Sequence, residues 1–456
     1  MGAQNSEDFV AWLEANEIVD GSSFEDIGGV VWLEEGVRIK EAFCNLVSKT
    51  FASFEFTQVE LPFFIPPAVY SRQPQHYEGL YHLTYKVTST NEEQSWYLRT
   101  TSETPFTYLF RRWLPRRGMP LRFFQVINVF RHETASRLKP LLRTREITPF
   151  IESYSGLPTY EAASDQVETE VKLYATILES LCIPYLLNRR PRFDTFPEAQ
   201  YTMAFDVILP SGEVFQIATV HHLGNSFGRA FEVCNTDGSY IWQTSTGISG
   251  RAIGCALAIH RDSSGVVLPY SITPRQVRIQ CDREVVPEAV EITRTLSGSN
   301  LAHLAHIEVT EGGGRESLLD WFGHGGCINI SLSSTSVTIT NRAGNVDQVQ
   351  KSNLEKGIER SIDNYSDWLP KRATVIQESH LSKIPMQTAK RQGFRGIIER
   401  PHCGEERCME QIRDQLKTTG QVLGTDASQS TSGKCEFCGG EARTNIRIAM
   451  SKVDYH

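Results

Sequence analysis

The feature that most constrains the fold is a pair of apolar stretches carrying charges at alternate positions. Residues 122–131 read Arg-Phe-Phe-Gln-Val-Ile-Asn-Val-Phe-Arg, with Glu133 two positions after Arg131. A second stretch after the segment 135–142 carries Arg143, Arg145 and Glu146. Aromatic and β-branched residues favour strands, in which side chains alternate between the two faces. The pattern therefore predicts an antiparallel hairpin with a charged face. Such a face either pairs internally in solvent or binds a charged ligand, because unpaired buried charges are costly.

Further stretches extend this sheet and divide the chain. Residues 201–209 and 214–220 are predicted strands joined by a Pro-Ser-Gly-Glu turn, while 160–182 and 251–259 are predicted helices. We expect an α+β catalytic domain with an antiparallel sheet over 24–275, after a polar N-terminal tail at 1–23. A small α/β domain is predicted over 276–370, with strands at 277–280, 305–309, 327–332 and 336–340 and helices at 286–297 and 346–368. The remaining segment, 371–456, contains a Gly/Ser/Thr/Gln-rich stretch at 418–433 that is predicted to be a loop.

Composition narrows the classes of partner. The chain has 46 Lys and Arg against 54 Asp and Glu, a net charge of −8, so nucleic-acid binding would require a local basic patch. No stretch approaches the roughly 20 apolar residues of a membrane span, and the scattered cysteines favour a reducing cytoplasm. We therefore expect a cytoplasmic protein with no membrane partner.

Four cysteines form two close pairs near the end of the chain. Cys403 and Cys408 are followed by Cys435 and Cys438, and two such pairs suit tetrahedral Zn²⁺. The alternative is a set of buried, unpaired thiols. Four thiolates leave no open coordination position, so the predicted Zn²⁺ is structural.

A separate signal lies at Gly247-Ile-Ser-Gly-Arg251. Here Arg251 stands at the predicted start of a helix, where an arginine and the helix-terminal amides can hold a phosphate together. A solvated arginine is the alternative interpretation for this motif taken alone.

Together these motifs resemble the class II aminoacyl-tRNA synthetases. Arg131-x-Glu133 and Gly247-x-x-x-Arg251 are similar to motifs 2 and 3 of that family, and Pro62 to motif 1, which implies a homodimer. The stretches 99–104, 130–134, 142–146, 216–224, 242–251 and 260–269 resemble prolyl-tRNA synthetases of the archaeal/eukaryotic type. The resemblance implies a class II antiparallel-sheet catalytic domain, a small α/β anticodon-binding-like domain and a C-terminal zinc-binding domain.

The resemblance also implies residue roles. Arg131 would bind the α-phosphate and the amino acid's carboxyl group, Glu133 the adenine amine, and Arg251 the γ-phosphate of ATP, with Mg²⁺ sharing the charge stabilisation. The rest of the implied ATP site comprises Arg143, Thr144, Gln216, Thr219 and Ser249. The implied amino-acid site comprises Thr101, Glu103 and His221 in addition to Arg131, with Glu103 pairing the amine.

Two regions depart from the family pattern. The specificity pocket, formed in the family by a Phe-Ala-Gly-Ala turn and an aromatic residue, corresponds here to Phe196, Glu198 and Thr246. The anticodon-reading segment corresponds to residues 312–341, which contain a single Lys or Arg, Arg315. Phosphate contacts supply most nucleic-acid affinity, so tRNA recognition by this segment is doubtful.

Three functions follow as hypotheses. We expect an ATP-dependent ligase that forms an aminoacyl-adenylate and transfers the amino acid to a small-molecule nucleophile in secondary-metabolite biosynthesis, without tRNA. The alternative is a divergent but genuine prolyl-tRNA synthetase that charges tRNA. A second alternative is a non-catalytic regulatory relative, which the intact Arg131, Glu133 and Arg251 disfavour.

Overall fold

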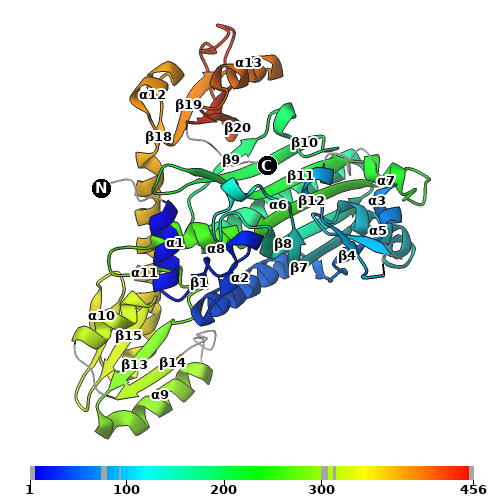
Figure 1. The fold of residues 1–456 in the computed structure, drawn as a ribbon. Coiled ribbons are helices and arrows are strands. Elements are labelled where there is room, and N and C mark those ends of the chain that lie inside the picture. The colour runs from blue at the N-terminus through cyan, green and yellow to red at the C-terminus, as the bar shows by residue number, and fades with distance from the viewer. Residues whose placement is uncertain (1–5, 73–79, 92–93, 299–306, 312–314, 451–456) are drawn as a thin grey trace.

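The computed structural model describes residues 6–72, 80–91, 94–298, 307–311 and 315–450. Within these ranges the strands form sheets of eleven, five, three and two strands. Figure 1 shows the large sheet in the middle of the molecule, a small α/β unit below it and a C-terminal unit above it. No helix in the described ranges is long and apolar enough to cross a membrane.

The large sheet is antiparallel except at its two ends. Its strand order is β18 (Leu381–Ser382), β19 (Ile397–His402), β21 (Thr444–Ala449), β20 (Gln421–Ser430), β9 (Leu186–Arg189), β10 (Tyr201–Ile208), β11 (Val214–Gly224), β12 (Trp242–Ser249), β8 (Glu146–Leu157), β7 (Leu121–Phe130) and β3 (Thr57–Gln58). The β18–β19 and β3–β7 pairs are parallel. The hairpin predicted from residues 122–146 is confirmed as β7 and β8, which pair from Leu121 with Gly156 to Phe130 with Glu146. The prediction that the charges lie on the strands is wrong for Arg131, Glu133, Arg143 and Arg145, which lie in the segment 131–145 between them.

Different helices cover the two faces of this sheet. On one face lie α2 (Glu34–Ser53), α6 (Tyr160–Ser180) and α8 (Arg251–His260), whose apolar side chains share one core cluster. Thr159 caps the start of α6, since its hydroxyl accepts a hydrogen bond from the Ala162 amide at 3.1 Å. On the opposite face α5 (Glu103–Arg117) packs against β7 and β8 through a second cluster that includes Phe106, Phe123 and Tyr154. This second face carries the candidate site.

The N-terminal segment is more ordered than a polar tail. Helix α1 (Ser6–Ala15) places Phe9 and Leu13 in the same core cluster as α2, α6 and α8. Short elements follow before α5, namely β1 (Val19–Asp20), β2 (Val31–Trp32), β4 (Phe64–Ile65), α3 (Pro67–Tyr70), β5 (Lys86–Thr88) and β6 (Ser95–Leu98).

The lower unit is a five-stranded mixed sheet. Its order is β14 (Ile307–Glu311), β13 (Val277–Cys281), β15 (Ile328–Leu332), β16 (Val337–Asn341) and β17 (Val346–Val349), with α9 (Val286–Gly298), α10 (Arg315–Gly323) and α11 (Leu354–Ser379) beside it. The start of the predicted strand 305–309 lies outside the described residues. The helix predicted at 346–368 is wrong at its beginning, because Val346–Val349 pairs with β16. It also continues to Ser379, through Pro370, so the predicted boundary at 370/371 falls inside α11.

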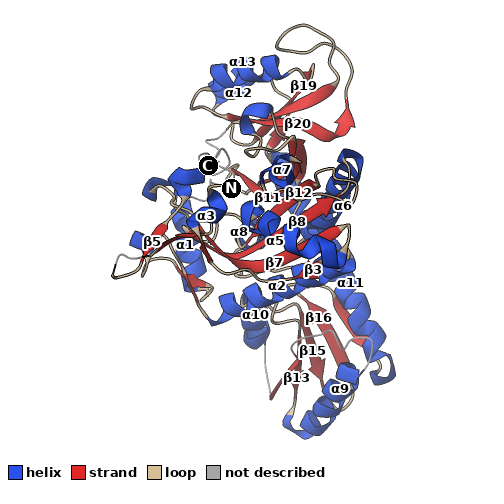
Figure 2. Cartoon of the chain, turned by 90° about the vertical axis from the view of Figure 1, so that its right-hand side faces the viewer, coloured by secondary structure: helices blue, strands red, loops and turns tan. Residues whose placement is uncertain are grey.

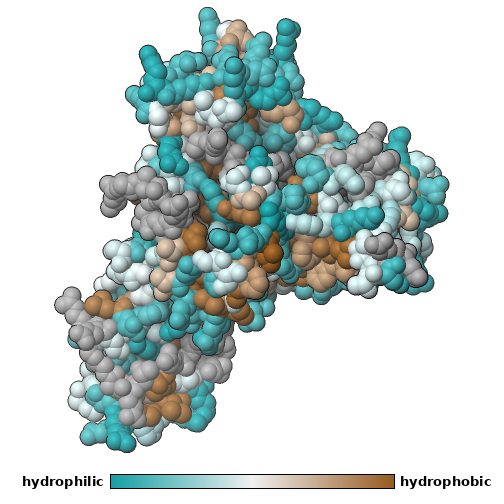
Figure 3. Space-filling model, in the orientation of Figure 1, coloured by the Kyte–Doolittle hydropathy of each residue, from teal (hydrophilic) through white to brown (hydrophobic). Residues whose placement is uncertain are grey.

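The C-terminal unit continues the large sheet. The loop predicted at 418–433 is wrong, since its residues 421–430 form β20, which pairs with β21 on one side and with β9 on the other. The short helices α12 (Met386–Gln392) and α13 (Glu406–Leu416) flank these strands. Figure 2 shows β19 and β20 above the strands of the central sheet, which they extend. On the face shown in Figure 3, hydrophilic residues cover most of this unit and hydrophobic ones gather over the middle of the molecule.

Candidate active site

A cavity of about 280 Å³ opens on the α5 face of the large sheet. It lies between the strands β8, β11 and β12, the start of α5 and the segment 193–197. Of the residues predicted from the sequence, those that border it are Thr101, Glu103, Arg131, Phe196, Gln216, Thr219, His221 and Thr246. The fold therefore brings together side chains that lie up to 120 positions apart in the sequence, between Thr101 and His221.

Glu103 is the buried acid of this cavity. It is the first residue of α5, and its carboxylate accepts a hydrogen bond from Thr101 Oγ1 at 2.5 Å. Burial raises the pKa of Glu103 to about 7, and the nearby charge of Glu152 adds to this increase. The carboxyl group is therefore poised to ionise when a cationic amine arrives, because the amine would replace the solvation that the site removes.

Glu152 is a supporting residue that the sequence analysis missed. Its Oε1 accepts hydrogen bonds from Ser102 Oγ at 2.5 Å and Gln125 Nε2 at 2.6 Å, and its Oε2 accepts one from the Tyr154 hydroxyl at 2.6 Å. Ser102 lies just before α5, Gln125 in β7 and Tyr154 in β8. Glu152 therefore links these three elements by hydrogen bonds next to Glu103. The signal available in the sequence was the alternation along β8, which puts Glu152 and Tyr154 on one face.

The two adjacent histidines lie on opposite faces of β11. His221 borders the cavity, its Nδ1 is hydrogen-bonded to Thr202 Oγ1 at 2.8 Å, and its ring lies 4.6 Å from that of Phe196. His222 is fully buried and its Nδ1 accepts a hydrogen bond from the Gly224 amide. Burial lowers the pKa of His222, as expected for a neutral core histidine.

Two of the predicted specificity-pocket residues, Glu198 and Thr246, do not direct their side chains into the cavity. The described residues that line the cavity include Phe196 and Pro197 but do not include Glu198, which has a left-handed φ of 70°. Thr246 borders the cavity, yet its hydroxyl lies 2.7 Å from Ser153 Oγ and 2.8 Å from the Tyr174 hydroxyl of α6. Its side chain therefore points to the opposite face of the sheet, and the side chain of Glu198 is not part of the cavity wall.

A second, smaller cavity adjoins the first and is rich in arginine. Arg131, Arg143 and Arg251 border it together with Glu133, whose Oε2 lies 3.7 Å from Arg143 Nη1. Arg251 donates hydrogen bonds to the carbonyl oxygens of Leu142 and Gln216, both at 2.7 Å. Burial and the charges of Arg143 and Arg131 lower the pKa of Arg251 to about 10. Three crowded cations favour a polyanion, because it relieves their mutual repulsion.

The other predicted ATP-site residues border one or both of these two cavities. Thr144 and Ser249 border the arginine-rich cavity, Thr219 borders the larger one, and Arg131 and Gln216 border both. Gly250 precedes α8 where the chain runs very close to β8, since a Cβ atom there would lie 2.5 Å from the Thr148 carbonyl oxygen. Arg131 thus lies between the two cavities, with Glu103 on one side and Arg143 and Arg251 on the other.

The four cysteines predicted as zinc ligands meet in the C-terminal unit. Cys408 Sγ lies 3.8 Å from Cys435 Sγ, and Cys438 Sγ lies 3.7 Å from Cys403 Sγ. Four sulfurs at about 2.3 Å from a tetrahedral zinc are separated by about 3.8 Å, so these two distances fit the metal. The ligand atoms that all lie within 4.8 Å of one another belong to Cys403, Cys408, Cys435 and His402, a group that does not include Cys438. His402, which the spacing did not single out, also brings a ring nitrogen within 4.8 Å of three of these sulfurs.

Comparison with known proteins defines the class first. Residues 85–260 match the family model of the tRNA synthetase class II core domain (G, H, P, S and T), in agreement with the predicted fold. The prolyl-tRNA synthetase of Giardia lamblia in complex with prolyl-adenylate superimposes with a TM-score of 0.89, at 24% identity and covering 99% of each chain. That of Cryptosporidium parvum, complexed with L-proline and AMP, superimposes with a TM-score of 0.83 at 21% identity, covering 98% of this chain and 95% of that one. The chain has the class II synthetase fold.

Curated sequences narrow the class to a family. The chain is 31% identical to the proline–tRNA ligase of Saccharolobus islandicus and 31% identical to that of Aeropyrum pernix, in each case over 98% of both chains. It is 28% identical to that of Thermococcus kodakarensis, again over 98% of both chains. The chain belongs to the proline–tRNA ligase family. Its reaction class is therefore that of a ligase which forms an aminoacyl-adenylate.

Proposed function

We propose that this protein activates L-proline with ATP and transfers the prolyl group to tRNA. The observation that carries the proposal is the meeting of two cavities at Arg131 and Gln216, one ending at the buried Glu103 and the other at Arg251. Relatives that share 31% of their residues over 98% of the chain are proline–tRNA ligases. These relatives favour tRNA as the acceptor over the small molecule that we expected from the sequence.

In this proposal each end of the site holds one substrate. Glu103 pairs with the secondary amine of proline, with Thr101 fixing the carboxylate and the ring of Phe196 packing beside His221. Glu133 accepts from the adenine amine, and Arg251 with Arg143 binds the outer phosphates. Thr144, Thr219 and Ser249 complete the ATP site.

The reaction is the attack of the proline carboxylate on the α-phosphorus of ATP, which releases pyrophosphate. Arg131 lies between the two cavities, where negative charge increases in the transition state, and its Nε is oriented by a hydrogen bond to the Thr100 carbonyl oxygen at 3.2 Å. Mg²⁺ would accompany ATP and share this charge, and Zn²⁺ in the cysteine cluster would be structural. No nucleophile of the chain is needed.

A second candidate, transfer to an acceptor other than tRNA, is favoured by the lower α/β unit. Arg315 is the single Lys or Arg of residues 312–341, of which 312–314 lie outside the described residues. Two neighbouring arginines are used internally, since Arg278 donates to Asn329 Oδ1 at 2.8 Å and Arg342 to Asp262 Oδ1 at 2.8 Å. This surface offers little positive charge to an anticodon loop.

Two measurements test these proposals in order. Amino-acid-dependent exchange of pyrophosphate into ATP, run with L-proline and the other nineteen amino acids, should show strong exchange with proline. Charging of total tRNA should then yield prolyl-tRNA. Proline-dependent exchange without charging would favour the second candidate, and exchange with a different amino acid would overturn the assignment of proline. A homodimer, implied by the motif 1 resemblance, is expected in sedimentation analysis.

A further inference from the structure

A buried arginine connects the active site to the C-terminal unit. Arg190 follows β9, and its guanidinium is held by Asp206 of β10 through hydrogen bonds of 2.7 and 2.9 Å. Both side chains are almost inaccessible to solvent, at 1% and 0% exposure. Removing two charges from water is expensive, so a pair in this position requires close geometry on every side.

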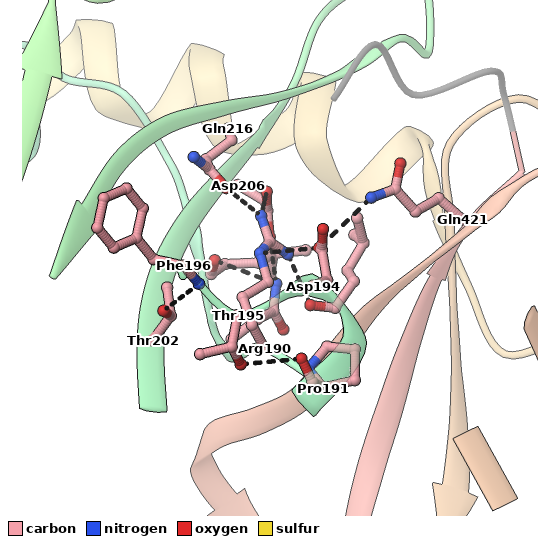
Figure 4. Close-up of polar contacts among 12 residues, drawn as sticks. Arg190, Pro191, Asp194, Thr195, Phe196, Thr202, Asp206, Gln216 and Gln421 are labelled. Atoms are coloured by element: carbon pink, nitrogen blue, oxygen red, sulfur yellow. Dashed lines mark hydrogen bonds and ion pairs between the residues drawn. The ribbon is translucent and has the colours of Figure 1, made fainter. Parts of the chain in front are cut away.

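The remaining donors of Arg190 reach in two directions. One reaches Gln216 Oε1 of β11 at 2.9 Å, on the side of the cavities. Another reaches the carbonyl oxygen of Leu423 in β20 at 2.6 Å, on the side of the C-terminal unit. Figure 4 shows Arg190 among Asp206, Gln216 and Asp194, with Gln421 hydrogen-bonded to Asp194 and not to Arg190.

The contact with Gln216 determines which way its carboxamide faces. An arginine can only donate, so the oxygen of the amide must face Arg190 and its NH₂ group must point elsewhere. Gln216 borders both the larger cavity and the arginine-rich one. Arg190 therefore orients a donor at the place where the amino acid and the α-phosphate meet.

The same guanidinium supports the wall of the larger cavity. Arg190 Nε lies 3.6 Å from Asp194 Oδ2, which also accepts a hydrogen bond from Gln421 Nε2 at 3.4 Å. Asp194 itself borders the cavity, two positions before Phe196. A residue of β20 and a residue next to β9 thus contact the same carboxylate oxygen of Asp194.

We propose that Arg190 is a positioning residue for adenylate formation, which orients Gln216 and Asp194 and makes β20 of the C-terminal unit part of the support of the active site. The proposal rests on the proposed function, because it concerns the binding of ATP and proline. Neither Arg190 nor its partners in β20 touch the reacting atoms. Their effect is expected on substrate binding, through the two residues that they hold.

The test compares two conservative substitutions at the same seam between β9 and the C-terminal unit. Arg190→Lys keeps the charge but loses the planar fork that reaches Asp206, Gln216 and Leu423 together. Arg447→Lys is the matched control, because Arg447 is also a buried arginine of this seam, paired with Asp426 at 2.6 Å and Asn188 at 3.1 Å. The contacts described for Arg447 reach neither Gln216 nor Asp194.

Both variants should lower Tm by a similar amount, which reports the loss of a buried arginine pair. Arg190→Lys should also raise the KM for ATP and for L-proline by about tenfold in pyrophosphate exchange, while Arg447→Lys keeps both within twofold of the wild type. Combined with Gln216→Ala, Arg190→Lys should add less loss than it causes alone, because part of its effect passes through Gln216. Wild-type KM values in Arg190→Lys, or full additivity with Gln216→Ala, would overturn the proposal.

The experiment separates failure of this proposal from failure of the proposed function. If the wild-type protein shows no exchange with L-proline, the proposed function fails. Calorimetric binding of AMPPNP then tests Arg190 alone. The Kd for AMPPNP should rise roughly tenfold in Arg190→Lys and should not change in Arg447→Lys. Equal affinity in all three proteins would refute the role of Arg190 whatever the substrate.

Discussion

The substitution Glu103→Gln should stabilise the protein and at the same time abolish its use of proline. Burial, with the charge of Glu152 as the second cause, raises the pKa of Glu103 from 4.5 to about 7. The folded state therefore binds this proton more tightly than the unfolded state does. The wild type consequently loses stability as the pH rises from about 4.5 to about 7, and the full loss persists above pH 7.

The size of the effect follows from the pKa difference. A shift of about 2.5 units at 1.36 kcal/mol per unit is worth about 3 kcal/mol at pH 8.5 and about 1 kcal/mol at pH 5.5. Glutamine has no charge to bury, so the free energy of unfolding of Glu103→Gln should not fall with this titration. Its stability relative to the wild type should therefore increase by about 2 kcal/mol from pH 5.5 to pH 8.5. The assay is urea unfolding of both proteins at pH 5.5 and pH 8.5, alongside proline-dependent pyrophosphate exchange.

The neighbouring acid provides the control. Every hydrogen bond described for Glu152 is donated to its oxygens, by Ser102, Gln125 and Tyr154. Glu152→Gln turns an NH₂ group toward one of these donors and should cost about 2 kcal/mol. If Glu103→Gln is less stable than the wild type at pH 8.5, or if its advantage is the same at both pH values, the reasoning about Glu103 is wrong.

Three further outcomes are expected. Arg251→Ala should reduce pyrophosphate exchange at least 100-fold without unfolding the protein, because it removes one of three cations from the phosphate end, and near-normal exchange would refute the assignment. Cys408→Ser should lower the zinc content measured by plasma mass spectrometry below one ion per chain and decrease Tm, whereas Ser replacing the distant, exposed Cys234 should change neither. Tyr174→Phe should cost about 1 kcal/mol through the lost bond to Thr246 yet leave the KM for proline unchanged, and a changed KM would show that Thr246 does shape the pocket.

The catalytic hairpin was predictable because its signal is local. Aromatic and β-branched residues fill 123–130 and recur after Glu146, and the resulting strands pair with each other in β7 and β8. The same holds for α8, where the motif itself marks the helix start at Arg251. In both cases neighbouring residues contain most of the information.

Elements that depend on distant partners were not predictable in this way. The polar composition of 418–433 indicates a loop, but β9 and β21 supply the hydrogen bonds that make a strand of it, and Arg447 pairs with its Asp426. The signal for β17 was local and was missed, since a tight turn at Gly344, with a φ of 89°, folds β17 back on the preceding strand β16. Glu152 and Arg190 carry no motif, since their importance comes from partners on other strands.

The pairing of β20 with β9 has a consequence for how the protein is made. About 230 residues separate the two strands, and translation at roughly 5–20 residues per second needs on the order of 10 to 50 s to cover them. During that time β9 is an open edge of a sheet that already carries the residues of the active site, and open edges recruit strands from other chains. A nascent chain of this protein should therefore depend on chaperones until β20 emerges. A premature stop between residues 260 and 421, after the central strands but before β20, should produce an aggregating product instead of a smaller enzyme.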